Sequence, residues 1–339
     1  MDELARYARW DGAGRPFAVV TAPRPRPGAG ELLVKIDLAT VCGSDVHTVE
    51  GKRPGPAPAV LGHEQVGTVV EAGAGAPARA GQRIVWSVTR SCGKCDRCRR
   101  DLPQKCLHLH KYGHEPLDET RPLTGGFATH CLLGPGTAVA EVPAEVPDEV
   151  AAPAACATAT VMAAVAAAGE IGPGDRALVT GAGMLGLTAT AVLAESGAHV
   201  VAADPDPARL EMAHRFGAKE VMTSSAAVRD IEVAIELSGA AAAVGDALAS
   251  LTIGGTLVLA GSVFPGPAVA VDPERVVRGL LTVTGVHNYR PADLRAAVAF
   301  LAAHHRRYPF AELVAGRYPL DRLGEAFRDT TAPRRGVAP

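Results

Sequence analysis

Two short polar stretches, residues 41–47 and Gly62-His63-Glu64, gather side chains that could do chemistry. Together they supply a thiol, a hydroxyl, two carboxylates and two imidazoles. Cys42 and His63 could bind zinc, since this metal prefers thiolate sulfur and imidazole nitrogen. A polar loop with an ordinary buried cysteine is the alternative, because burial is a common fate of free cysteine. Composition alone leaves both interpretations open.

The other polar side chains of these stretches could support such a metal. Asp45 and Glu64 could lie behind the ligands, because a ligating histidine usually donates its second ring N–H to a carboxylate. Ser44 and His47 could move a proton, and histidine suits this role because its unperturbed pKa is about 6.5.

Four further cysteines follow the spacing Cys-x2-Cys-x2-Cys-x7-Cys, at Cys92, Cys95, Cys98 and Cys106. Four thiolates can close a tetrahedron around zinc without an open position, which is typical of a structural site. A redox pair, disulfides and an iron–sulfur cluster are the alternatives, and the cluster is the strongest of these because similar spacing occurs there. The absence of a proline after the last cysteine and the zinc-like stretch nearby favour zinc.

Composition and length bound the class of protein. A chain of 339 residues predicts two domains. The formal net charge of −2 provides no basic field for nucleic acid, and no run of about 18 apolar residues predicts a membrane span. The acidic N-terminus, Met1-Asp2-Glu3-Leu4, does not resemble a signal peptide. We therefore expect a cytoplasmic protein, in which clustered cysteines more often bind metals than form disulfides.

Residues 1–150 predict a β-rich domain with long loops. Short Val/Ile/Leu runs bounded by turn residues indicate strands; the clearest are 32–36, 66–70 and 83–86. The composition changes near Val150, and one alanine-rich helix is expected over residues 151–168. From about Asn288 the chain turns polar again, and we expect the tail to rejoin the first domain.

A glycine motif, Gly181-Ala182-Gly183-Met184-Leu185-Gly186, lies between a predicted strand and a predicted helix. In this context Gly-x-Gly-x-x-Gly binds a dinucleotide. The first glycine permits a tight turn, the second lets the backbone approach a pyrophosphate, and the third lets the helix pack on the strand. The helix N-terminus favours the anion. Strands and helices then alternate to about residue 286, which predicts a doubly wound parallel sheet.

Asp204 ends the next predicted strand, 18 residues after Gly186. A carboxylate at this spacing accepts the ribose hydroxyls of NAD and repels the 2′-phosphate of NADP. A turn aspartate before Pro205 also explains the residue type. Arg209 weakens the preference, because a nearby arginine can hold a 2′-phosphate. On balance the spacing favours NAD.

In this order and at these spacings, the motifs resemble those of the zinc-dependent alcohol dehydrogenases of the medium-chain dehydrogenase/reductase superfamily. The resemblance covers nearly the whole chain. It implies a GroES-like catalytic domain, residues 1–150 with 288–339, and a Rossmann NAD-binding domain, residues 151–287. Relatives form dimers or tetramers, so a homodimer or homotetramer is expected. Relatives also carry a full helix where this chain has only residues 221–233, so that helix is expected to be short or absent.

The resemblance supplies Cys156 as a third ligand of the catalytic zinc, beside Cys42 and His63, with an open position for water or alcohol. Considered alone, Cys156 would be a small buried thiol in an alanine-rich helix. Thr160 matches a position that packs at the nicotinamide. Cys131 is left over and is expected in the core of the β-rich domain. The cofactors implied are two zinc ions per chain and NAD, with NADP less favoured.

The resemblance also implies the reaction, a reversible oxidation of an alcohol to an aldehyde or ketone. Zinc acts as a Lewis acid, so that a zinc-bound alkoxide forms near neutral pH. The proton leaves through Ser44 to His47, and hydride passes to the nicotinamide. Asp45 is expected to orient His63, and Glu64 to lie behind the zinc. Alternatives are a zinc-free quinone or enoyl reductase, which would lack both cysteine sets, and a non-catalytic nucleotide-binding scaffold, which would have lost a ligand or the relay.

A closer resemblance is to a branch associated with phosphonate metabolism. It rests on residues 46–51, 111–115, 261–265 and 285–289. A phosphonate substrate would need a cationic pocket. The candidates are Lys52, Arg53, His110, Lys111, His114 and Arg290, although a solvated loop position is the commoner fate of such residues. A polyol or another secondary alcohol is the alternative substrate.

Overall fold

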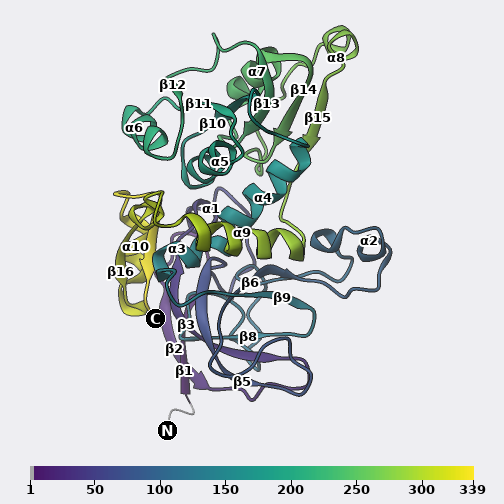
Figure 1. The fold of residues 1–339 in the computed structure, drawn as a ribbon. Coiled ribbons are helices and arrows are strands. Elements are labelled where there is room, and N and C mark those ends of the chain that lie inside the picture. The colour runs from purple at the N-terminus through teal and green to yellow at the C-terminus, as the bar shows by residue number, and fades with distance from the viewer. Residues whose placement is uncertain (1–3) are drawn as a thin grey trace. The chain divides into compact units, whose positions relative to one another are not determined.

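The computed structural model describes residues 4–339 (Figure 1). Residues 1–3, on which the expectation about a signal peptide partly rests, lie outside the described residues. The chain divides into two compact units. The first unit comprises Met1–Cys156, Arg290–Arg306 and Phe310–Pro339, and the second comprises Ala157–Tyr289 and Arg307–Pro309. The boundary lies after Cys156, where the sequence placed it after residue 150.

The first unit is built mainly from antiparallel strands in two sheets. The smaller sheet has the order β2-β1-β4 and consists of β1 (Leu4–Trp10), β2 (Ala18–Pro23) and β4 (Ala59–Val60). The larger sheet has the order β16-β17-β3-β5-β6-β7, with β8 on β3 and β9 on β6. Its strands are β3 (Leu32–Thr40), β5 (Gln65–Ala72), β6 (Arg83–Arg90), β7 (His110–Lys111), β8 (His130–Leu133), β9 (Thr137–Glu141), β16 (Val314–Tyr318) and β17 (Arg334–Val337).

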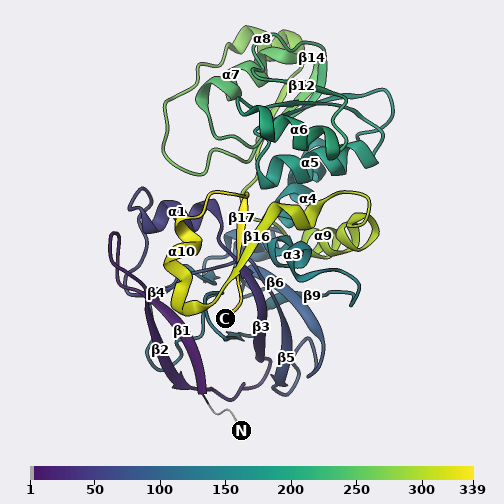
Figure 2. The ribbon, with the colours of Figure 1, turned by 90° about the vertical axis from the view of Figure 1, so that its left-hand side faces the viewer.

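In the larger sheet, a strand from the end of the chain, β17, lies beside a strand from its beginning, β3. Strand β17 pairs antiparallel with β3 through Gly336 and Val337, and β16 pairs parallel with β17 (Figure 2). A core of buried side chains, including Trp86 and Phe127, fills the space between the sheets. The C-terminus therefore belongs to the first unit. Helices complete this unit: four short ones, α1 (Gly43–Val49), α2 (Asp96–Arg99), α3 (Asp148–Ala151) and α10 (Leu323–Arg328), and the longer α9 (Pro291–His304).

The second unit contains one parallel sheet of the order β12-β11-β10-β13-β14-β15. Its strands are β10 (Arg176–Thr180), β11 (His199–Ala203), β12 (Glu220–Met222), β13 (Ile231–Glu236), β14 (Leu251–Leu259) and β15 (Thr282–Gly285). Its helices are α4 (Ala157–Ala168), α5 (Met184–Glu195), α6 (Pro207–Arg215), α7 (Ala241–Ser250) and α8 (Pro273–Gly279). The strand order reverses between β10 and β13, so the sheet is doubly wound, which confirms the predicted fold class.

Alternating side chains of the parallel strands bury both faces of this sheet. Val179 packs with residues of α4 and α5, whereas its neighbour Leu178 packs with residues of α7. This alternation follows from the period of two in a strand. In the described structure no helix lies between β12 and β13, as the short connection led us to expect. The connection between β12 and β13 therefore contributes no helix that covers the sheet.

The prediction of a single helix over residues 151–168 is wrong. The chain forms α3, a 3-10 helix over Ala152–Ala155, and then α4, with Cys156 outside helical geometry at φ −121° and ψ −65°. Pro153 explains the interruption, because proline cannot donate the helical hydrogen bond and its ring crowds the preceding turn. Among residues 4–339 no single helix has the length and apolarity needed to cross a membrane. The bent pair Asp148–Ala155 and Ala157–Ala168 meets these two criteria only when its helices are taken together.

Candidate active site and metal centres

Helix α1 begins directly after Cys42, and a carboxylate fixes its first turn. Asp45 Oδ2 accepts a hydrogen bond from the backbone N–H of Cys42 at 3.1 Å, as the third residue of a capping box does. Asp45 is buried, so this bond forms away from water. Ser44 and His47 are three residues apart on the same helix and therefore lie on one face of it. The helix thus fixes all four side chains relative to one another.

Four donor side chains from distant parts of the first unit converge. Cys42, His63, Glu64 and Cys156 offer ligand atoms that all lie within 4.8 Å of one another. They come from the start of α1, from the residues before β5 and from the helix break after the 3-10 segment. A zinc ion binds such donors at about 2.0–2.3 Å, so one ion could reach several of them at once. The interruption at Cys156 places its thiol within reach of the other donors.

Charge is concentrated at this convergence. Burial lowers the pKa of His63, but Asp45 and Cys42 outweigh burial and raise this pKa to about 10. Asp45 Oδ1 lies 3.3 Å from His63 Nδ1, and Ser44 Oγ lies 3.4 Å from His63 Nε2. Contact with Cys156 lowers the pKa of the Cys42 thiol well below its usual range, and the same contact raises the pKa of Cys156. A buried thiolate, an imidazole and a second thiol are donors that zinc prefers, so these residues fit a zinc ion.

Glu64 is held by an arginine that sequence reasoning missed. Arg334, at the start of β17, donates from Nε to Glu64 Oε2 at 2.6 Å and from Nη2 to Oε1 at 2.8 Å. The Thr40 hydroxyl donates to Glu64 Oε2 at 2.7 Å. Arg334 Nη2 also lies 3.4 Å from Cys42 Sγ. Because both oxygens of Glu64 already accept hydrogen bonds, Glu64 lies behind the other three donors.

The Glu64–Arg334 pair is fully inside the first unit. Glu64 has no exposed surface, and the side chain of Arg334 is 7% exposed. Burial raises the pKa of Glu64, although Arg334 lowers it. The only sequence signal was a pair of adjacent arginines, Arg334 and Arg335, in a segment that is otherwise apolar enough for a strand. Nothing in that pattern indicates a partner 270 residues away.

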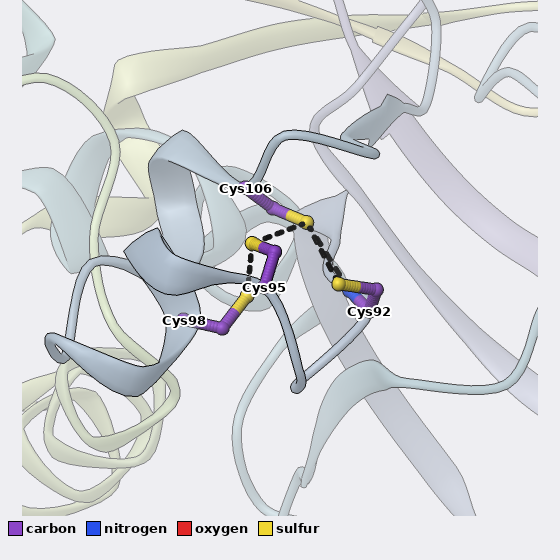
Figure 3. Close-up of side chains that lie close together, drawn as sticks. All are labelled: Cys92, Cys95, Cys98 and Cys106. Atoms are coloured by element: carbon purple, nitrogen blue, oxygen red, sulfur yellow. Dashed lines mark hydrogen bonds between the residues drawn. The ribbon is translucent and has the colours of Figure 1, made fainter.

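The four remaining candidate cysteines form a separate lobe around α2 (Figure 3). Sulfur–sulfur distances are 3.5 Å for Cys95–Cys98, 3.8 Å for Cys95–Cys106 and 3.5 Å for Cys92–Cys106. A tetrahedron with metal–sulfur bonds of about 2.3 Å has edges of about 3.8 Å. Backbone N–H groups of Cys92 and His108 also point at Cys106 Sγ, each at 3.3 Å.

These distances suit a single ion. An iron–sulfur cluster binds its cysteines through several irons and would hold them further apart. All seven cysteines are free, so the disulfide alternative is wrong. Cys131 is fully buried in the core of the first unit.

In the second unit the glycine motif joins β10 to α5. Gly181 adopts φ +87°, and a Cβ on Gly186 would lie 1.7 Å from the carbonyl oxygen of Gly181. A Cβ on Gly183 would meet nothing within 4 Å. Gly183 is the residue before α5, which begins at Met184 and continues through Leu185. The motif thus exposes backbone only where a pyrophosphate could approach the helix N-terminus.

Asp204 lies at the carboxyl end of β11 and contacts the same loop. It is 4% exposed; Oδ2 accepts from the backbone N–H of Ala182 at 2.7 Å and Oδ1 from that of Asp206 at 2.9 Å. Arg209 Nη1 lies 3.6 Å from Asp204 Oδ2, and Arg209 Nε lies 3.6 Å from Asp206 Oδ2. Asp204 therefore serves the turn, as one interpretation had it, and also stands beside the glycine motif. Thr160 is half-buried on α4.

The six basic residues considered for a cationic pocket fall into two groups by their contacts. Three of them contact carboxylates: Lys52 Nζ lies 2.8 Å from Glu50, His110 Nδ1 3.9 Å from Glu115, and Arg290 Nη1 3.1 Å from Asp101. The other three are linked through His114: Arg53 Nη1 contacts His114 Nε2, the His114 ring contacts the His63 ring, and the backbone N–H of His114 donates to the carbonyl of Lys111. Three of the six basic residues therefore already have a carboxylate partner.

The two units and the donor set define a zinc-binding dehydrogenase with a dinucleotide-binding sheet. Residues 28–144 match the family model described as the alcohol dehydrogenase GroES-like domain, and residues 185–303 match the one described as zinc-binding dehydrogenase. The chain is 30% identical over 326 residues to sorbitol dehydrogenase of Halalkalibacterium halodurans, covering 92% of this chain and 91% of that protein. It is 31% identical over 363 aligned positions to a probable alcohol dehydrogenase of Mycobacterium tuberculosis, covering 97% and 98%.

Solved structures agree with these relatives. An alcohol dehydrogenase from Thermotoga maritima superposes with a TM-score of 0.92 at 27% identity, covering 99% of both chains. A putative zinc-binding dehydrogenase from Sinorhizobium meliloti, bound to NADP, superposes with a TM-score of 0.88 at 25% identity, covering 100% of both chains. The chain belongs to the zinc-dependent alcohol dehydrogenase family of the medium-chain dehydrogenase/reductase superfamily.

The buried Glu64–Arg334 pair leads to a prediction about stability. Arg334→Gln should lower the free energy of unfolding by about 3–5 kcal/mol, because the Glu64 carboxylate stays buried without its partner. Urea unfolding of the first unit measures this loss. The double variant Glu64→Gln/Arg334→Gln removes both charges and should be less destabilised than the sum of the single variants. Additive losses would show that the pair is not coupled.

Proposed function

We propose that the protein is a zinc-dependent, NAD-linked dehydrogenase that interconverts an alcohol with an aldehyde or ketone. The observation that carries this proposal is the convergence of Cys42, His63 and Cys156 in a chain of the zinc-binding dehydrogenase family. Two relatives are named sorbitol dehydrogenase and 5-exo-hydroxycamphor dehydrogenase, the latter from Pseudomonas putida, and both names describe oxidation of an alcohol. The complete donor set argues against a zinc-free reductase and against a scaffold that has lost its chemistry.

The proposal includes two zinc ions per chain. Cys42, His63 and Cys156 would hold the catalytic ion, and the four-cysteine lobe would hold the structural one. When bound, zinc supplies a Lewis acid that lowers the pKa of an alcohol, and nicotinamide supplies the hydride acceptor. Asp45 orients the His63 ring from the Nδ1 side. Glu64, neutralised by Arg334, supports the donors from behind without adding net charge.

Ser44 and His47 would move the alcohol proton away from the reacting oxygen. Ser44 Oγ lies 3.4 Å from His63 Nε2, so the hydroxyl stands beside the proposed ligand atom. His47 lies one helical turn further along α1, on the same face. The hydroxyl would pass the proton toward the imidazole, which then releases it to solvent.

We also propose NAD as the dinucleotide. Gly181, Gly183 and Gly186 shape the loop, and Met184 and Leu185 begin the helix that faces the pyrophosphate. The Asp204 carboxylate would repel a 2′-phosphate and accept the ribose hydroxyls. Arg209, already drawn to Asp204 and Asp206, is less available to a phosphate than a free arginine would be. Thr160 is assigned to the nicotinamide end of the cofactor.

The substrate proposal has two candidates. A hydroxyalkylphosphonate follows from the resemblance to the phosphonate-associated branch. A polyol or another secondary alcohol is favoured by the relative named sorbitol dehydrogenase. Relatives named L-threonine 3-dehydrogenase show that family names cover neutral and charged alcohols. A screen of NAD reduction across polyols, simple alcohols and hydroxyalkylphosphonates tests both candidates.

We further propose that the chain assembles into a homodimer or homotetramer in the cytoplasm. Strand β15 forms one edge of the parallel sheet, and Val283 on it is 43% exposed. Val277 and Leu280, in and after α8, and Ile253 on β14 are more exposed still. An exposed apolar sheet edge is suited to pairing with a second copy. Seven free cysteines suit a reducing compartment.

Removal of a proposed zinc ligand tests the central proposal. Cys42→Ala should retain close to one zinc per chain, that of the lobe, and should lose NAD-dependent alcohol oxidation. Metal analysis and initial rates measure both quantities on the same sample. Cys131→Ala is the matched control, because Cys131 is also a buried cysteine of the first unit but lies outside both donor sets. Normal activity of the Cys42→Ala variant would refute the assignment.

The proton relay predicts a pH-dependent defect. His47→Gln should slow alcohol oxidation at low pH by roughly hundredfold, the lower end of what a general base typically contributes. The defect should shrink as pH rises, since hydroxide can then accept the proton directly. The measurement is the rate of alcohol oxidation by wild type and variant at a series of pH values from about 6 to about 10. An unchanged pH–rate profile would remove His47 from the relay.

The charge of Asp204 predicts the cofactor preference. kcat/KM should be higher with NAD than with NADP, and Asp204→Asn should narrow this ratio by about tenfold, because it removes the repulsion of the 2′-phosphate. Asp206→Asn is the matched control: Asp206 also contacts Arg209 but does not contact the glycine loop through its side chain. A wild-type preference for NADP would contradict the proposal.

A further inference from the structure

Two basic side chains, Arg53 and His114, lie beside the proposed zinc ligand His63. Arg53 Nη1 lies 3.1 Å from His114 Nε2. The His114 ring lies 4.8 Å from the His63 ring, measured between centroids. The backbone N–H of Arg53 donates to the carbonyl of His47 at 3.0 Å, which fixes the Arg53 loop to α1. Arg53 is therefore one side chain removed from a proposed zinc ligand.

His114 orients Arg53 and adds no positive charge. His114 Nδ1 lies 3.0 Å from the carbonyl oxygen of Tyr112, so this nitrogen carries the hydrogen and donates it. His114 Nε2 is then the acceptor for the Arg53 guanidinium. A guanidinium has five N–H donors, and this contact uses one of them.

Lys111, at the end of β7, is joined to His114 through the main chain, because the backbone N–H of His114 donates to the carbonyl of Lys111 at 3.0 Å. Burial and Arg53 lower the pKa of Lys111, whereas the Cys156 and Cys42 thiols raise it. Glu115, the nearest acidic residue in sequence, accepts the backbone N–H of Lys111 at 2.6 Å and lies 3.9 Å from His110. Its contacts are thus with the main chain and with His110.

Arg53 and Lys111 differ from the other basic residues considered for this pocket. Within residues 4–339 neither has a carboxylate at ion-pair distance, whereas Lys52 and Arg290 do. Both are half-buried. A partly buried cation without an anion is costly, and the cost falls when a ligand supplies the anion. A guanidinium and an ammonium together suit the oxygens of a carboxylate or a phosphonate.

Resting on the proposed dehydrogenase function, we propose that Arg53 and Lys111 form a subsite for an anionic oxygen group carried by the alcohol substrate. His114 is the positioning residue that holds the Arg53 guanidinium in place. The substrate class is a short hydroxyalkyl compound whose carboxylate or phosphonate lies a few bonds from the carbon that is oxidised. The two anions share this recognition chemistry and are distinguished by experiment.

The kinetic test uses three alcohols of similar length on the zinc-loaded enzyme: 1-propanol, 3-hydroxypropionate and 2-hydroxyethylphosphonate. Wild type should favour one of the anionic alcohols over 1-propanol in kcat/KM by about tenfold or more. Arg53→Gln and Lys111→Gln should each lower kcat/KM for the favoured anionic alcohol by about tenfold to hundredfold, mainly by raising KM. This loss should exceed any loss of kcat/KM for 1-propanol. Arg53→Lys keeps the charge and should restore part of the preference. Lys52→Gln is the matched control, since Lys52 is 66% exposed and paired with Glu50, and should change nothing.

A binding measurement separates the subsite from turnover. Calorimetric titration of the zinc-loaded protein with methylphosphonate and with acetate should show which anion binds. The Kd of that anion should rise about tenfold or more in Arg53→Gln and Lys111→Gln and stay unchanged in Lys52→Gln. Binding that depends on Arg53 and Lys111, in a protein that oxidises none of these three alcohols and no polyol or other secondary alcohol of the screen, would support the subsite and overturn the proposed function.

Two results would overturn the subsite while leaving the dehydrogenase in place. The first is turnover of 1-propanol without preference for either anionic alcohol, combined with anion binding that the variants do not alter. The second is an equal loss on all three alcohols in the variants, which would mean that the two cations stabilise negative charge at the reacting oxygen in general.

Discussion

The buried ion pair between Glu64 and Arg334 joins an early and a late segment of the chain inside the first unit. An isolated carboxylate at that depth would cost several kcal/mol, so its position requires a cation with matched geometry. Arg334 provides it with two short hydrogen bonds, and Thr40 provides a third. The arginine can reach this place only because β17 pairs with β3, the strand that leads to Cys42. The donors therefore depend on a strand contributed by the last residues of the chain.

The same dependence on distant segments holds for the other donors. Asp45 caps α1 by its bond to the backbone of Cys42 and lies 3.3 Å from His63, so one carboxylate links two proposed ligands. Cys156 reaches them because Pro153 prevents a regular helix and the chain leaves helical geometry at Cys156. In the second unit the reversal of strand order between β10 and β13 places the glycine loop at the position where doubly wound sheets bind their ligands. Each chemically active loop thus follows a strand or a helix break that fixes its direction.

Local patterns predicted much of this architecture, because their physical causes are local. The glycine motif depends only on its own turn and on the strand and helix beside it. The four cysteines lie close enough together in the sequence to form their lobe without a distant segment of the chain. The sequence therefore indicated both, together with the alternation that produces the parallel sheet. The continuous helix over residues 151–168 was wrong because alanine propensity does not register the effect of one proline. Arg334 was missed because its partner is 270 residues away, and only the pairing of β17 with β3 brings the two together. Spacing likewise could not divide six basic residues into three with carboxylate partners and three linked through His114.

The charge balance around the donors explains why it matters for substrate specificity which basic residues lack a carboxylate partner. Two thiolates would balance the charge of one zinc ion, and Arg334 balances Glu64. Asp45 then contributes one negative charge, while Arg53 and Lys111 contribute two positive ones. With the proposed zinc bound and both cations charged, as the proposed subsite requires, the surroundings of the donors would carry a surplus of one positive charge, in a region partly shielded from water where charges interact more strongly. A neutral alcohol would leave that surplus uncompensated, whereas an alcohol that carries an anion would remove it. The two cations would therefore act as a filter on substrate charge, separate from the groups that carry out the reaction.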